Sequence, residues 1–307
     1  MKNNVQLQKL PLNGKTSGLI FTFASLIPFA IVITLSFVIS GIQDELLESR
    51  AWYIYLSYAI TPVALLLSIF VLYTWLQRKG YTIAVGLNKF DKRYLYVIPL
   101  VAFGCIFGLG FLNTYFNNWI IDLGYKASTI SPPIANVGQL FLSLLVVAVL
   151  PAVIEEWVFR GAILQGLKGT GTVVCSLLGA FAFSLFHHNP LQTIYQFLMG
   201  GIYTYLTLKS GSIFVSMVAH FINNAFIIIF SFFAGANYNY GWVQYLLIPL
   251  GLIALVGAFF LVRYISKGNA INTEEVEEEQ TNQTGDFFKY GSVGIAVLVL
   301  QIILTFI

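Results

Sequence analysis

The sequence predicts an all-α fold, a polytopic membrane helix bundle with about eight or nine transmembrane helices. Three observations support this class. Hydrophobic residues make up 58% of the 307 residues and charged residues only 9%, whereas about a quarter of the residues in a soluble domain are charged. Apolar runs of about 18 residues or more recur along the whole chain. The sequence does not show the short alternating segments of a membrane β-barrel.

Nine apolar segments are candidate membrane spans. They cover residues 18–41, 52–76, 94–116, 137–164, 171–187, 190–208, 211–233, 242–263 and 290–307. The connection at 114–136 is long and mixed, so it is either a loop or a segment that enters the membrane. The two cysteines, Cys105 and Cys175, fall inside apolar segments, which favours packing roles over a disulfide or a metal site.

The basic residues predict the orientation of the bundle. Most of them precede the first segment or follow even-numbered segments, and only Arg50 and Lys126 lie on the opposite side. By the positive-inside rule the N-terminus is cytoplasmic and the C-terminus lies outside. We expect a multi-pass protein of a cell membrane, and the Asn-, Ile- and Phe-rich composition suggests a bacterial plasma membrane. The basic residues are spread along the membrane edges, so we expect no nucleic-acid partner.

Three charged residues interrupt the fourth segment: Glu155, Glu156 and Arg160. A charge at the bilayer centre costs about 3 kcal/mol, so these groups require partners, water or a function. Glu156 and Arg160 share a helical face and are expected to form an ion pair. Glu155 is rotated from Glu156 by about 100° and is left as the freer carboxylate, turned toward other helices.

All three histidines lie within or at the ends of the fifth and seventh segments. His187 ends the fifth segment and His188 directly follows it, and the spacing from Phe183 selects His187. His220 lies in the seventh segment, four residues before Asn224. A lone intramembrane histidine is usually structural, but every histidine of the chain lies near the buried carboxylates. This concentration favours one shared polar site.

Three motifs therefore follow one another along the fourth, fifth and seventh segments: Glu155-Glu156-x-x-x-Arg160, Phe183-x-x-x-His187 and His220-x-x-x-Asn224. Their combination resembles the CAAX protease and bacteriocin-processing (CPBP) family of intramembrane endopeptidases, also called the Abi family. We divide the chain accordingly into N-terminal helices and a connecting loop (1–134), a CPBP/Abi catalytic core (135–233) and C-terminal helices (234–307) with an acidic linker at 266–287.

The resemblance implies a role for each motif residue. Four are implied to be catalytic: Glu155 as the general base that activates water, His187 as the group that helps to hold this water, and His220 and Asn224 as oxyanion stabilisers. Three are implied to support them: Glu156, Arg160 and Phe183.

This glutamic-type mechanism needs no cofactor, and we expect none. A zinc-dependent variant stays open, because Glu155, His187 and His220 would make a two-histidine, one-carboxylate site with an open water position. The His-Glu-x-x-His motif of common metalloproteases does not occur in the sequence.

The predicted function is an intramembrane protease similar to CAAX prenyl protease 2, of glutamic or metallo type, acting in the lipid bilayer on membrane-associated proteins or peptides. The family resemblance implies two substrate classes, prenylated CAAX proteins or bacteriocin and pheromone precursors. We expect the second class, with bacteriocin immunity as a role. Two other functions stay open: a catalytically silent regulator or scaffold of the same family, and a proton-coupled transporter. The inverted repeat and paired broken helices of such transporters are missing.

Overall fold

The structure is a computed structural model that describes residues 11–39, 51–81, 86–125, 132–235, 240–267 and 282–306. Within these ranges the regular elements are helices and no β-strand occurs, which confirms the predicted all-α class. Seven helices or continuous helical runs are long and apolar enough to cross a membrane. The protein is therefore a multi-pass membrane protein.

All nine predicted segments correspond to helical parts of the chain. The third is a run of α4, the π-helical turn η1 and α5, and the fourth is a run of α6, α7 and the π-helical turns η2 and η3. The bounds are α1 Gly14–Ile39, α3 Ala51–Arg78, α4 Tyr94–Phe103, η1 Gly104–Leu109, α5 Gly110–Asp122, α6 Val137–Ser143, η2 Leu144–Val149, α7 Leu150–Glu156, η3 Trp157–Ile163, α8 Thr172–Phe186, α9 Thr193–Ser210, α10 Ile213–Ala234, α11 Gln244–Ser266 and α12 Gln283–Leu304.

Two helical parts extend beyond their predicted ends by six residues or more. The third run continues to Asp122, and α12 begins at Gln283 instead of residue 290. The polar start of α12 is supported by α1, because the Gln283 side chain accepts a hydrogen bond from the Gly14 backbone N–H. Residues 268–281 of the predicted acidic linker lie outside the described residues, as do residues 126–131 of the long connection.

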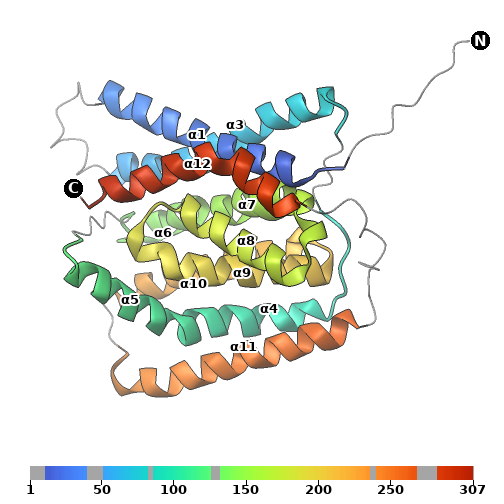
Figure 1. The fold of residues 1–307 in the computed structure, drawn as a ribbon. Helices are drawn as coiled ribbons and strands as arrows, with labels where there is room; N and C mark the ends of the chain where they lie inside the picture. Colours follow the sequence, from blue (N-terminus) through green and yellow to red (C-terminus); the bar gives the residue numbers. More distant parts are fainter. Residues whose placement is uncertain are drawn as a thin grey trace, which may run out of the picture.

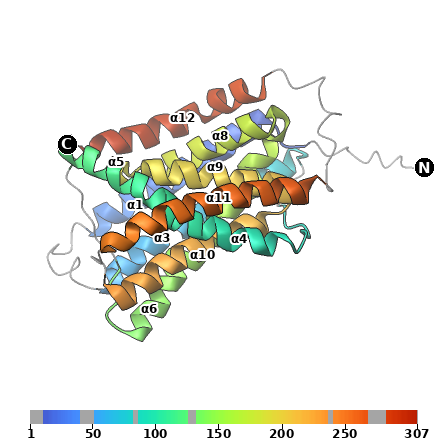
Figure 2. The same ribbon diagram turned by 90° about the horizontal axis from the view of Figure 1, so that it is seen from below.

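The helices form three layers (Figure 1). The first contains α1, α3 and α12, the second contains the helices from α6 to α10, and the third contains α4, α5 and α11. Seen from below, α11 crosses the middle layer beside α4 (Figure 2). One apolar core joins α1, α3 and α12 to η3 and α8, and a second joins α4, η1 and α11 to α9 and α10. The middle layer is therefore covered on both sides.

The first and last described helices are paired side by side. Thr22 of α1 donates to the backbone carbonyl of Tyr290 of α12, with an O–O distance of 2.8 Å. A Cβ atom added at Gly18 would lie 2.6 Å from the carbonyl oxygen of Phe287, so the small residue permits the close approach. On its other side α1 contacts the middle layer, where Ser17 Oγ donates to the carbonyl oxygen of Ile163 at 2.7 Å.

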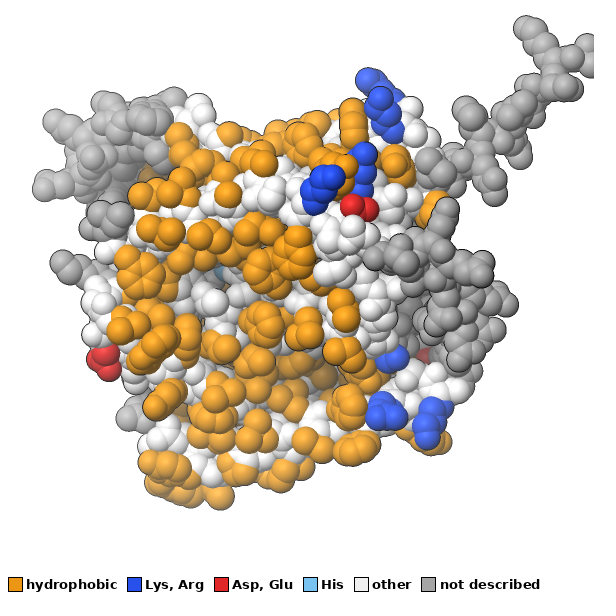
Figure 3. All heavy atoms as spheres, in the orientation of Figure 1, with side chains coloured by type: hydrophobic (Ala, Val, Ile, Leu, Met, Phe, Trp, Pro, Cys, Tyr) orange, Lys and Arg blue, Asp and Glu red, His pale blue; other side chains and the backbone are white. Residues whose placement is uncertain are grey.

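The outer surface is apolar across its middle and basic along one edge (Figure 3). Among the described residues, every Lys and Arg except Arg160 lies in a connection or within two turns of a helix end: Lys15, Arg78, Lys79, Lys89, Lys92, Arg93, Lys168, Lys209, Arg263, Lys267 and Lys289. These helix ends lie on one side of the bundle (Figure 1). This segregation is typical of the cytoplasmic side of a membrane protein. The cytoplasmic N-terminus stays a prediction that the segregation favours.

Candidate active site

The seven predicted site residues all lie on three helical parts of the middle layer. Glu155 and Glu156 end α7 and Arg160 lies in η3, Phe183 lies in α8 and His187 directly follows it, and His220 and Asn224 lie in α10. Glu156, Arg160 and Phe183 are fully buried, and Glu155 and His220 are only 8% and 4% exposed. The two apolar cores thus enclose a polar cluster inside the membrane-spanning bundle.

The helix that carries the two glutamates is irregular on both sides. The π-helical turns η2 and η3 flank α7, and Pro151 stands in its first turn. Proline has no backbone N–H, so it cannot donate to the carbonyl oxygen of Val147, four residues earlier. The carbonyl of Val147 is thereby free to accept from a side chain of another helix. Such π-helical turns inside α-helices often occur at functional sites.

The predicted ion pair between Glu156 and Arg160 is present. Arg160 Nη1 donates to Glu156 Oε1 at 2.8 Å, and Nη2 donates to the carbonyl oxygen of Gly200 in α9 at 3.0 Å. The guanidinium also lies 4.4 Å from the centroid of the Phe183 ring. Arg160 therefore fixes the Glu156 carboxylate and joins η3 to both α8 and α9.

His220 binds the paired glutamate, a contact that the sequence did not predict. Its Nδ1 lies 3.1 Å from Glu156 Oε1, the same oxygen that accepts from Arg160. A carboxylate oxygen accepts, so Nδ1 carries the proton and Nε2 is the atom left for other partners. The ring stacks on Tyr203 of α9, with centroids 5.5 Å apart. The pairing of His220 with Glu156 depends on how α10 lies against α7, and the spacing of residues within one helix does not reveal it.

Glu155 and His187 face each other across a short gap. His187 Nε2 lies 4.0 Å from Glu155 Oε2, beyond direct hydrogen-bond distance. Its Nδ1 lies 2.8 Å from the carbonyl oxygen of Phe183, which can only accept, so Nδ1 is protonated and Nε2 of the neutral ring is an acceptor. The neighbouring His188 leaves the helix with a φ of 35° and bonds to the carbonyl of Phe186 instead.

Asn224 is oriented by a chain of hydrogen bonds. Its Nδ2 donates to Val147 O at 3.0 Å, and its Oδ1 accepts from Asn223 Nδ2 at 3.2 Å. Asn223 Oδ1 in turn accepts from the Tyr195 hydroxyl at 2.8 Å. An amide nitrogen carries two donors, so one N–H of Asn224 is left for another partner.

The polar cluster lies in the part of the chain that matches a known protein family. Residues 137–226 match the family model of the Rce1-like type II CAAX prenyl endopeptidases. This range runs from α6 into α10 and contains all seven predicted site residues. The predicted family resemblance is confirmed for this Rce1-like segment. No curated protein and no solved structure matched the chain.

Two residues of the Rce1-like segment were missed by the sequence reading. Tyr203 stacks on His220 and lies 5.6 Å from the Arg160 guanidinium, measured to the ring centroid. Asn223 orients Asn224, its neighbour in sequence. The pair of adjacent asparagines was a visible signal for the second residue. Tyr203 gave no such signal, because aromatic residues are common throughout the apolar segments.

Close packing of α8 against α9 brings the second motif to the first. A Cβ atom added at Gly200 would lie 3.0 Å from both Ala180 Cα and Phe183 Cβ, and one added at Gly179 would lie 2.3 Å from Thr204 Oγ1. The absence of side chains at these two glycines therefore lets the helices touch. As a result Phe183 can reach Arg160, with His187 one turn further along.

A metal site in the Rce1-like segment is the alternative to a water-based mechanism. Within the described ranges, no three His, Cys, Asp or Glu side chains are gathered closely enough to bind a metal ion. The alternative zinc ligands Glu155, His187 and His220 therefore do not form such a group. The three side chains as placed do not fit a zinc site.

Proposed function

We propose that the protein is an intramembrane endopeptidase in which Glu155 activates a water molecule. The observation that carries this proposal is the 4.0 Å separation of Glu155 Oε2 from His187 Nε2. A water with hydrogen bonds of about 2.8 Å to both atoms spans such a gap at an angle of about 90°. Both atoms accept, so this water donates both protons and its lone pairs are free for attack.

The other site residues suit the remaining steps of amide hydrolysis. Attack forms a carbon–oxygen bond, Glu155 takes one proton of the water, and the carbonyl electrons move to the oxygen. The second N–H of Asn224 can donate to this oxyanion. His220 can donate through Nε2 when its ring carries both protons, and the Glu156 carboxylate then balances the positive charge. Glu155 returns the proton to the nitrogen when the carbon–nitrogen bond breaks.

The substrate is proposed to be a membrane-associated protein or peptide. The family match names CAAX prenyl endopeptidases, so prenylated C-terminal peptides are one class to test. Unprenylated precursors of secreted peptides are the other, and the one expected from the sequence. The buried position of the polar cluster favours a substrate that enters from the bilayer.

Cleavage by the purified protein tests the proposal. Both peptide classes would be incubated with wild type, Glu155→Gln and the matched control Asp122→Asn, which changes a carboxylate at the end of α5. We expect Glu155→Gln to lower kcat by at least about a thousandfold, because the base is lost, and Asp122→Asn to retain activity. Equal cleavage by all three would refute the glutamate mechanism.

Further measurements distinguish the alternative functions. Loss of cleavage with a chelator and recovery with zinc would replace the water mechanism by a metal-dependent one. No cleavage of either class by folded wild type would favour a regulatory role. Proton flux in liposomes that depends on Glu155 would favour a transporter.

A further inference from the structure

An open cavity of about 340 Å³ lies at the basic edge, between the start of α1 and the end of α3. Its lining includes two lysines, a hydroxyl, an indole and two leucines: Lys15, Thr16, Leu19, Trp75, Leu76 and Lys79. None of the candidate active-site residues is among them. The cavity is therefore a separate feature of the first layer.

The cavity is positively charged. Lys15 and Lys79 are both exposed, and none of the lining residues is acidic. Within the described ranges neither lysine forms an ion pair with a carboxylate. Lys15 Nζ lies 5.0 Å from the Tyr290 ring centroid, a contact that leaves its N–H donors available. Two ammonium groups around one space repel each other unless an anion lies between them.

The cavity also lies next to an exposed apolar face of α3. Trp75 and Tyr81 lie at the level of the lysines, where such aromatic side chains anchor proteins at a membrane interface. Trp75 at the rim is exposed to the surroundings, and Val71 and Leu67, one and two turns before it in α3, are exposed apolar side chains. An anion that carries a hydrocarbon chain suits this arrangement better than a free anion.

We propose that this cavity binds the phosphate group of an anionic phospholipid from the surrounding leaflet. The ammonium groups of Lys15 and Lys79 would contact the phosphate, and the acyl chains would lie along the exposed apolar side chains of Trp75, Val71 and Leu67 on α3. Basic groups at a membrane surface attract anionic lipids in this way. The cavity differs from the rest of the basic edge because it provides two lysines, an indole and an apolar floor together.

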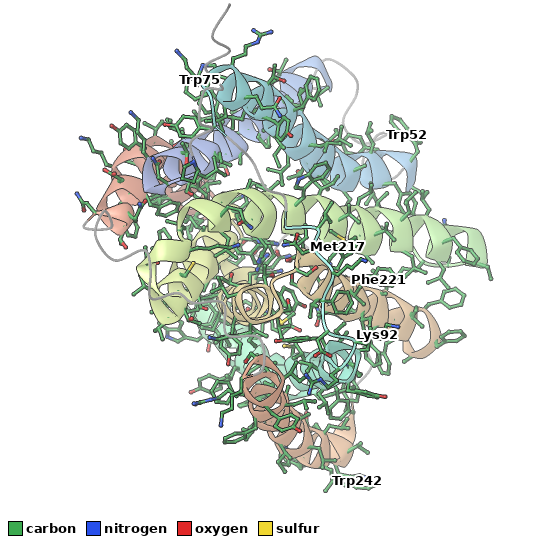
Figure 4. The ribbon with its side chains drawn as sticks, turned by 90° about the vertical axis from the view of Figure 1, so that its right-hand side faces the viewer. Trp52, Trp75, Lys92, Met217, Phe221 and Trp242 are labelled. Carbon is green, nitrogen blue, oxygen red and sulfur yellow. The ribbon has the colours of Figure 1, made fainter. Side chains whose placement is uncertain are left out.

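Lipid retention measured by native mass spectrometry tests this proposal. The full chain in detergent would be titrated with phosphatidylglycerol, with phosphatidylcholine and with inorganic phosphate as a competitor. We expect phosphatidylglycerol to bind wild type about tenfold more tightly than phosphatidylcholine, and Lys15→Gln/Lys79→Gln to remove this preference. The matched control is Lys92→Gln/Lys267→Gln, which removes two charges from the same edge; Lys92 lies well away from Trp75 (Figure 4).

Three outcomes would overturn the proposal. Equal binding of the two lipids would show that charge plays no part. Equal loss of the preference for phosphatidylglycerol in the control variant would show that the whole basic edge attracts the lipid and that the cavity is not a specific site. Displacement of phosphatidylglycerol by inorganic phosphate at similar concentrations would show a site for free phosphate.

Discussion

The side-chain amide of Asn224 donates a hydrogen bond to the carbonyl oxygen of Val147, with a nitrogen–oxygen distance of 3.0 Å. Pro151 makes this contact possible, because it leaves Val147 without its α-helical donor. We expect Pro151→Ala to supply a competing backbone N–H and to lower kcat about tenfold, a partial loss of one oxyanion donor. Peptide cleavage and thermal unfolding measure the two effects separately. Pro249→Ala in α11 is the control, and an unchanged rate in Pro151→Ala would remove the proposed link.

The buried ion pair predicts that two arginines contribute very differently to the free energy of unfolding. Arg160→Met removes the cationic partner of the buried Glu156 carboxylate and one of the two side-chain donors to the Gly200 carbonyl oxygen, so we expect it to lower the free energy of unfolding by about 3–5 kcal/mol. Arg93→Met removes an exposed ion pair with Asp91, which water screens, and should leave the stability nearly unchanged. Unfolding in a denaturing detergent measures both. Similar losses for the two variants would contradict the buried pair.

Adjacent glycines in α9 offer a test of helix approach. A Cβ atom at Gly200 would lie 3.0 Å from the Ala180 backbone, whereas one at Gly201 would lie 3.5 Å from the nearest side chain. Gly200→Ala must therefore move α8 and should destabilise the protein by about 1–3 kcal/mol, with a fall in kcat because Phe183 and His187 shift. Gly201→Ala should be tolerated. The prediction fails if thermal unfolding cannot tell the two variants apart.

Tyr195 is expected to act through Asn223 on Asn224. Tyr195→Phe removes one hydroxyl from the chain of hydrogen bonds and leaves the ring in place. We expect kcat to fall by about threefold to tenfold, in line with one hydrogen bond of about 1 kcal/mol, and KM to stay unchanged. Tyr205→Phe, on the same helix, is the control. A change confined to KM would assign Tyr195 to substrate binding instead.

The sequence was sufficient to predict the helices, the cluster and one of its pairs, but not the partner of His220. Apolar runs are long enough to define each span, and the spacing of Glu156 and Arg160 defines their pair. The partner of His220 depends on how α10 lies against α7, which no spacing within one helix contains. The π-helical turns were also not predicted. Such a turn inserts one extra residue into an α-helix and would shift an amphipathic pattern, but a segment that is apolar on all sides has no such pattern.

Helix boundaries show the same limit. Residues 283–287 were predicted to belong to the acidic linker, yet they begin α12, where α1 provides a partner for Gln283. The match to the Rce1-like segment likewise ends within α10. The outer helices carry no motif, so their places in the bundle become visible only in three dimensions.

The pairing of α1 with α12 has a consequence for biosynthesis. Among the described helices α1 leaves the ribosome first, but the partner that packs along it is the last to be made. Until then the Gly18 face of α1 is open to lipid, and α1 is also the helix that holds Ile163 through Ser17. The order of synthesis and the order of assembly therefore differ, and the middle layer gains its full support only when the last of these helices has been inserted.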